Sequence, residues 1–244
     1  MTAHSLRPGS RTPRDLLVVG AGGFARETIE AVHAINEQAP TWRLLGLLDD
    51  DPSRHGLRFA GVPVIGIPEL VHDHPDAAVV ICTGRPDDYA SRYRLASRLA
   101  LPVERYGTIV HPAASLAGSC VVGAGSVLLA HVTATSEVVI GRQVCVMPQV
   151  VLTHDDLVGD WVTLASGVRV GGAARIGSGA YLGSGALIRE GLQIGAWSMI
   201  GMGSVVTRDV PDRRVWFGAP ARDVRAAVVH LGVVDVLAGE RVIR

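Results

Sequence analysis

An aliphatic residue recurs at every sixth position through the second half of this chain. From Val110 to Val206 each step is Val, Ile or Leu except Ala134, and no residue is inserted or lost between them. Gly often follows the aliphatic residue directly, and a small or apolar residue usually stands four places after it. A period of six does not match the 3.6 residues of an α-helical turn, so each hexapeptide is predicted to be one short strand and one turn.

Three such hexapeptides make a triangular coil of eighteen residues. The aliphatic side chains fill the interior, small residues stand where the chain bends, and glycine allows backbone turns that side chains would obstruct. Successive coils stack as parallel strands about 4.8 Å apart. This pattern is typical of a left-handed parallel β-helix, which establishes a shape and does not by itself establish an active site.

The first half of the chain alternates predicted strands and helices. Strands are expected over 16–19, 44–48 and 77–82, and helices over 26–35 and 87–99. Alternation with short connections indicates a small parallel α/β unit, in which ligands bind beyond the carboxyl ends of the strands. The glycine turn 20–25 should therefore meet Asp49 and Asp50, which follow the second strand.

This glycine turn fits the GxGxxA form of the nucleotide-binding fingerprint. The unit has only about ninety residues and is too short for a six-stranded Rossmann domain. We expect a Rossmann-like half that holds one nucleotide or a nucleotide-sugar. The alternative is that the glycines only allow tight packing of strand against helix.

Four segments follow from these patterns. We expect a disordered tail over 1–14, the Rossmann-like acceptor-binding unit over 15–106, the β-helix over 107–222 and an unassigned extension over 223–244. The first fifteen residues contain no apolar run, so we expect neither a signal peptide nor a membrane anchor. Lys plus Arg and Asp plus Glu both number 23, which gives no charge bias toward nucleic acid or a membrane surface. The three cysteines form no CxxC pair, so we expect a cytoplasmic protein without disulfides.

The hexapeptide 152–157 is the most polar one of the repeat. It contains His154, and the position eighteen residues later is Gly172, so the two should stack at one corner of the prism. Acyl transfer needs a general base and an N–H donor where the thioester oxygen gains charge. A histidine serves as the base near neutral pH, with Asp155 as its first carboxylate partner and Asp156 as its second.

Two other interpretations of this corner compete with catalysis. A lone histidine in a turn is usually a solvated surface residue, although a polar triplet inside an apolar register and a glycine one coil later favour a site. A metal centre is not expected, because His111, His131 and His154 are too widely spaced to form a three-histidine zinc site.

Five motifs together resemble the bacterial sugar O-acyltransferases. They are the glycine turn 20–25, THDD at 153–156, VGG at 170–172, IGMGSVV at 200–206 and FGAPAR at 217–222. The family includes sialic acid O-acetyltransferases and N-acetyltransferases of UDP-4-amino-sugars, and the resemblance covers residues 15 to about 222. It implies a homotrimer with acetyl-CoA in the groove between neighbouring β-helices. It also implies a sugar or nucleotide-sugar acceptor held between the N-terminal unit and the histidine.

The resemblance also assigns roles by position. His154 would be the base, Asp155 its acidic partner, and the Gly172 N–H the oxyanion donor beside the cofactor. The positions that match the acetyl-CoA channel and the C-terminal loop near it are Ser184, Met202, Gly218, Ala219, Pro220 and Ala221. The positions that match the nucleotide-sugar pocket are Gly22, Gly23, Phe24, Asp49 and Asp50.

Three positions depart from the family pattern. Phe24 stands where many amino-sugar enzymes have His, Arg85 where relatives often have Asn, and Met147 where some have Asn. All three belong to the acceptor side, so the acceptor, and whether nitrogen or oxygen is acylated, stay open. The leading hypothesis is a CoA-dependent acetyltransferase without a metal. The alternatives are a non-catalytic scaffold that binds a nucleotide-sugar, and a transferase that moves a longer acyl group to a non-sugar metabolite.

Overall fold

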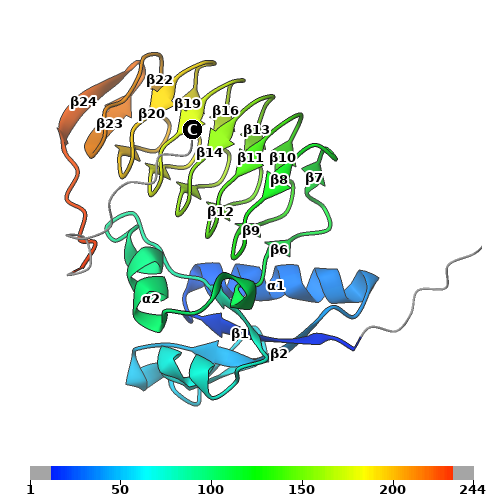
Figure 1. Ribbon diagram of the computed structural model, residues 1–244. Helices are drawn as coiled ribbons and strands as arrows, with labels where there is room; N and C mark the ends of the chain where they lie inside the picture. Colours follow the sequence, from blue (N-terminus) through cyan, green and yellow to red (C-terminus); the bar gives the residue numbers. More distant parts are fainter. Residues whose placement is uncertain (1–11, 233–244) are drawn as a thin grey trace, which may run out of the picture.

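The aliphatic hexapeptides form a three-sided prism of stacked parallel strands, drawn from green to orange in Figure 1. The computed structural model describes residues 12–232; residues 1–11 of the predicted tail and 233–244 of the predicted extension lie outside that range. Strand partners in neighbouring coils are eighteen residues apart, as in the pairing of Leu152 with Val170. The predicted β-helical fold is therefore confirmed.

Each side of the prism is one parallel sheet, named here after its first strand. The β6 face contains β6 (Ile109–Val110), β9 (Val127–Leu128), β12 (Cys145–Val146), β15 (Thr163–Leu164), β18 (Tyr181–Leu182) and β21 (Met199–Ile200). The β7 face contains β7 (Ser115–Leu116), β10 (Thr133–Ala134), β13 (Val151–Leu152), β16 (Arg169–Val170), β19 (Leu187–Ile188) and β22 (Val205–Val206). The β8 face contains β8 (Val121–Val122), β11 (Val139–Ile140), β14 (Leu157–Val158), β17 (Arg175–Ile176) and β20 (Gln193–Ile194).

Four-residue turns join the faces at three corners. The β7–β8 corner includes turns 117–120, 135–138, 153–156 and 171–174; the β8–β6 corner includes 123–126, 141–144, 159–162 and 195–198; the β6–β7 corner includes 129–132, 147–150, 183–186 and 201–204. The second residue of each strand points inward and is buried in most coils. Ala134 packs there between Leu116 and Leu152 in the register that the repeat predicts.

The six-residue register ends after β22. Val210 forms an isolated bridge with Ile194. The chain then forms the antiparallel pair β23 (Arg214–Gly218) and β24 (Ala221–Ala226), which extends the β6 face. β24 therefore continues into the segment 223–244 that the sequence left unassigned.

The N-terminal unit is a five-stranded sheet in the order β3-β4-β2-β1-β5. Its elements are β1 (Arg14–Val19), α1 (Gly23–Gln38), β2 (Trp42–Leu48), β3 (Arg58–Phe59), β4 (Val62–Gly66), β5 (Ala78–Ile81) and α2 (Ser91–Leu99), with 3-10 turns at Pro52–Arg54, Pro68–His72 and Val103–Arg105. The strands β4, β2, β1 and β5 are parallel. The three predicted strands and two predicted helices are present, and the β3–β4 pair is additional.

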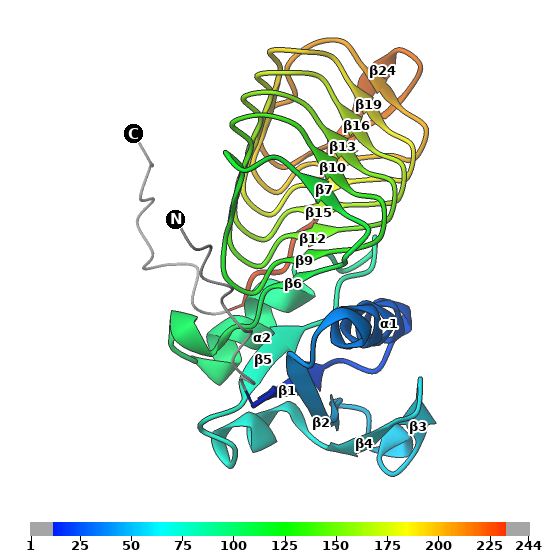
Figure 2. The same cartoon turned by 90° about the vertical axis from the view of Figure 1, so that its right-hand side faces the viewer.

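The N-terminal unit lies along the prism, and both views show α1 and α2 between its sheet and the coils (Figures 1 and 2). Arg92 of α2 is buried and donates hydrogen bonds to the carbonyl oxygens of Gln143 and Trp161 at 3.1 Å each. The Tyr89 hydroxyl donates to the carbonyl of Trp197 at 2.9 Å. These bonds fix α2 along the β8–β6 corner. No helix in the described part of the chain is long and apolar enough to cross a bilayer.

Candidate functional site

His154 and Gly172 lie on successive coils of the β7–β8 corner. Each is the second residue of its turn, after β13 and β16 respectively. A Cβ atom added to Gly172 would overlap the imidazole ring of His154 and would lie 2.9 Å from its Cδ2. The ring therefore covers the glycine backbone, as the eighteen-residue phase predicts.

Asp155 holds one side of the imidazole. Its Oδ2 lies 2.8 Å from Nδ1 of His154. Asp155 has a φ of 63°, a left-handed conformation that Asp tolerates better than most residues. A carboxylate at Nδ1 favours the tautomer in which the proton is on that nitrogen, which leaves Nε2 free to accept one. Both side chains are solvent-accessible, at 66% for His154 and 61% for Asp155.

Asp156 occupies a different environment from Asp155. It is fully buried, and its carboxylate accepts the backbone N–H groups of Thr153 at 2.9 Å and Ala174 at 3.0 Å. Burial raises the pKa of Asp156 to about 7 in spite of these two hydrogen bonds. The sequence ranked Asp156 as a second partner for the imidazole, whereas its oxygens bind main-chain N–H groups.

The residues assigned to the acetyl-CoA side surround the β6–β7 corner, across the β7 face from His154. Ser184 and Met202 lie on successive coils, where the N–H of Gly203 donates to the Ser184 carbonyl at 2.8 Å. Met202 is 80% exposed. Gly218 at the end of β23 and the turn residues Ala219 and Pro220 are exposed, while Ala221 is buried in the prism core.

The acceptor-side residues gather at the carboxyl edge of the N-terminal sheet. Asp49 Oδ2 accepts the N–H of Ala21 at 2.8 Å, so the glycine turn and the end of β2 meet. Asp49 also pairs with Arg54 at 3.2 Å. Asp50 pairs with Arg98 at 2.8 Å, so both carboxylates are already engaged within the unit.

The start of α1 offers open backbone beside Asp49. Gly22 precedes the helix and Gly23 is its first residue. A Cβ atom at either glycine would have no neighbour within 4 Å. The N-terminus of a helix is favourable for an anionic group, because its first N–H groups lack intrahelical acceptors. Phe24 is partly buried against the core of the N-terminal unit.

Within one chain these three groups of residues remain apart. The α/β unit is fixed along the β8–β6 corner, His154 stands at the β7–β8 corner, and Met202 stands at the β6–β7 corner. Among residues 12–232, no hydrogen bond or ion pair joins the His154 corner to the acceptor-side residues.

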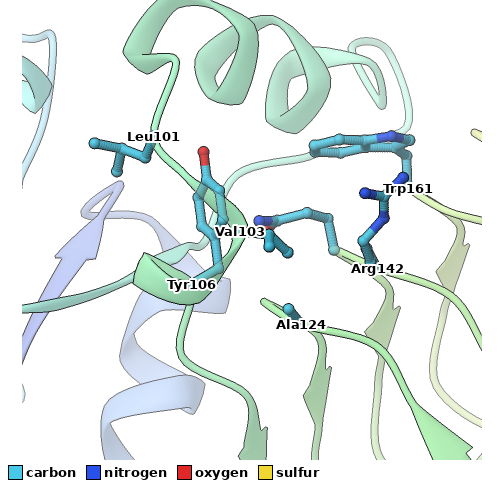
Figure 3. Close-up of a pocket in the computed structure, with 7 residues that line it drawn as sticks. Leu101, Val103, Tyr106, Ala124, Arg142 and Trp161 are labelled. Atoms are coloured by element: carbon cyan, nitrogen blue, oxygen red, sulfur yellow. The ribbon is translucent and has the colours of Figure 1, made fainter.

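A cavity lies elsewhere, at the junction of the two units. Its volume is about 260 Å³, and Figure 3 shows Tyr106, Trp161 and Arg142 around it. The lining residues are Leu101, Val103, Tyr106, Ala124, Arg142, Gln143 and Trp161. None of the predicted site residues is among them.

Sequence reasoning missed one charged side chain on the β7 face. Arg169 is exposed on β16, between the His154 corner and the Met202 corner. Its Nη1 donates to the carbonyl of Gly167 at 3.3 Å, and no ion pair with an acid forms within the described residues. The sequence signal that could have identified Arg169 is a charged residue directly before the inward-facing aliphatic residue of its hexapeptide. No group of three or more potential metal-binding side chains occurs within residues 12–232.

Residues 15–97 match the model of the PglD N-terminal domain. A UDP-N-acetylbacillosamine N-acetyltransferase of Bacillus subtilis (strain 168) is 32% identical over 119 residues, which are 48% of this chain and 52% of that protein. The chain therefore matches about half the length of this curated relative.

Two solved structures match nearly the whole chain. The acetyltransferase domain of PglB from Neisseria gonorrhoeae FA1090, in complex with acetyl coenzyme A, is 25% identical with a TM-score of 0.76, over 87% of this chain and 100% of that one. A histidine-to-asparagine mutant of perosamine N-acetyltransferase from Caulobacter crescentus, in complex with CoA and GDP-perosamine, is 26% identical with a TM-score of 0.76. That match covers 91% of this chain and 99% of the other. The resemblance drawn from the motifs is confirmed.

Proposed function

We propose that this protein transfers an acetyl group from acetyl-CoA to a nucleotide-sugar. Its fold and its N-terminal domain resemble those of the hexapeptide-repeat sugar acyltransferases. The observation that carries this proposal is the imidazole of His154 lying over the backbone of Gly172. The solved relatives that bind acetyl-CoA, or CoA with GDP-perosamine, support the choice of donor and acceptor class.

The reaction needs one proton acceptor and one N–H donor. Nε2 of His154 would remove the proton from an acceptor amine or hydroxyl as that atom attacks the thioester carbonyl. The resulting oxyanion would accept the N–H of Gly172, which has no acceptor among residues 12–232. Asp155 would stabilise the imidazolium. The C–S bond then breaks, and the imidazolium returns its proton to the leaving thiolate.

The β7 face and its edges suit a long anionic donor. Met202 and the turn at Gly218 to Pro220 offer an exposed apolar and glycine-containing surface. Arg169 places a cation on the same face, where it would pair with a phosphate group of CoA. The thioester would then extend from this face toward His154.

The acceptor unit would reach the histidine only through a second chain. The glycine turn and His154 are at different sides of one protomer, so a homotrimer would place the acceptor edge of one chain near the β7–β8 corner of its neighbour. The open backbone at Gly22 and Gly23 would receive an anionic phosphate of the nucleotide-sugar.

The test is release of free thiol from acetyl-CoA with UDP-, GDP- and dTDP-linked amino-sugars as acceptors. His154→Asn should lower kcat at least about a hundredfold, because a general base contributes this much or more. The affinity for acetyl-CoA should persist. His131→Asn is the matched control, since His131 is an exposed turn histidine at the β6–β7 corner. Near-normal turnover with His154→Asn would exclude His154 as the base.

The same reagents separate the other two hypotheses. A scaffold subunit would bind a nucleotide-sugar in calorimetry without saturable binding of acetyl-CoA. A transferase for longer acyl groups would release thiol faster from butyryl- or hexanoyl-CoA than from acetyl-CoA.

A further inference from the structure

Asp156 is the one charged residue at the inward turn position of the hexapeptide series. This position, four places after the aliphatic residue, holds Val138 one coil before and Ala174 one coil after. Both neighbours are buried in the prism core, and Asp156 is also fully buried. A carboxylate without a cation partner is costly at such a place, so its presence calls for a reason.

Its two oxygens connect the coils on both sides of the candidate catalytic pair. Oδ2 accepts the N–H of Thr153, the residue before His154, at 2.9 Å. Oδ1 accepts the N–H of Ala174, two residues after Gly172, at 3.0 Å. One carboxylate thus fixes the backbone that carries the base relative to the backbone that carries the N–H donor.

Elsewhere in the prism, an uncharged side chain makes a similar bond between coils. Ser126 occupies the same turn position at the β8–β6 corner, where its hydroxyl accepts the N–H of Val144 at 2.9 Å. That hydroxyl also donates to the carbonyl of Gly141 at 2.8 Å. Joining two coils therefore does not require a carboxylate. Asp156 adds an acceptor for Thr153 and a negative charge near the imidazole.

Few other charges act on this carboxyl group. His154 and Asp155 belong to its own turn. The turn of the next coil, 171–174, contains only glycine and alanine, and the turn of the preceding coil, 135–138, contributes only the exposed Glu137. Charge at Asp156 therefore acts mainly on the pair formed by His154 and Asp155.

We propose that Asp156 is a positioning residue for acetyl transfer, which sets the spacing of His154 and Gly172 and favours the protonated imidazole. This inference rests on the proposed function. A role in stability alone would make any side chain that restores the coil-to-coil bond an adequate replacement.

Asp156→Ser is the discriminating variant, because serine at this turn position makes the coil-to-coil bond at residue 126. We expect a folded protein whose kcat falls at least about tenfold while the KM for acetyl-CoA changes less than about twofold. Ser126→Ala is the matched control. It removes the same kind of bond away from the histidine, and it should lower the thermal midpoint without lowering kcat.

The pH profile gives a readout that a purely structural role would not change. Because burial raises the pKa of Asp156 to about 7, its negative charge is present above this pH and is lost as the pH falls. In the wild type, log(kcat/KM) should therefore rise with pH between about 6 and 8, as this carboxyl loses its proton. In Asp156→Ser this slope should be smaller, because serine does not ionise in this range.

The possible outcomes separate a failure of this inference from a failure of the proposed function. If the wild type releases no thiol with any acceptor, the proposed function is wrong, and so is the inference that rests on it. An active wild type together with Asp156→Ser at the wild-type kcat, or with an unchanged slope, overturns the inference alone.

Discussion

The lack of a side chain at Gly172 matters because of the ring above it rather than because of its backbone. Its φ is not in the left-handed region, so alanine could adopt this conformation. The obstacle is the imidazole of His154, which occupies the space that a Cβ would need. The glycine therefore lets the base and the N–H donor face the same small volume.

Gly172→Ala should lower kcat at least about tenfold, because the methyl group displaces the imidazole and shields the N–H donor. Gly118→Ala is the control at the same turn position and the same corner, where an added Cβ meets no atom within 4 Å. Thiol release by both variants is the measurement. Equal activity of the two would show that the ring does not act where the structure places it.

Phase along the repeat was enough to predict that His154 stacks on Gly172, since eighteen residues make one coil. The environments of the two aspartates were harder to predict. Asp155 and Asp156 are adjacent, but the first is exposed and the second is fully buried. The burial of Ala221 was also missed, because the FGAPAR motif gives no indication of which of its residues face the core.

At the scale of elements, not every buried polar group at the junction of the two units has a hydrogen-bond partner among the described residues. Arg92 donates to main-chain carbonyls of the prism, whereas neither atom of the buried Gln143 side-chain amide has a hydrogen-bond partner among residues 12–232. An unpaired buried polar group costs roughly 1–3 kcal/mol. This amide therefore weakens the contact between the units.

Gln143→Met should raise the free energy of unfolding by about 1 kcal/mol, because methionine keeps the length of the side chain and removes the unpaired amide. The carbonyl that Arg92 uses belongs to the backbone and stays. Gln149→Met is the control, since Gln149 is exposed and shares the left-handed turn conformation, with a φ of 63° against 57°. Urea denaturation measures both. A loss of stability in Gln143→Met would mean that the amide has a partner.

The elements were predictable where one pattern was long. Seventeen steps of the aliphatic series became strands β6 to β22 without a shift in register. The β3–β4 pair escaped prediction because Arg58 and Pro63 interrupt its apolar residues and the two strands are short. The β23–β24 pair escaped because it follows the end of the six-residue period.

At the scale of the whole molecule, the distance between the acceptor edge and His154 within one chain predicts a shared site. We expect a particle of three times the 25.6 kDa chain mass by analytical ultracentrifugation. Gly22→Glu, which fills the open backbone at α1, and His154→Asn should each be inactive. Mixed under conditions that exchange subunits, they should regain activity. No regain after proven exchange would place both functions within one chain.

Because the register is uninterrupted, the number of coils sets the distances along the prism axis. Each coil advances the chain by about 4.8 Å along the axis, and His154 lies in the turn after β13, which is the third strand of the β7 face counted from β7. Inserting or deleting one whole coil of eighteen residues before β13 would move the imidazole by that increment and leave every inward side chain in phase. A length change that is not a multiple of eighteen residues would turn the base toward a different side or break the register. Reach along the axis can therefore change only in discrete steps.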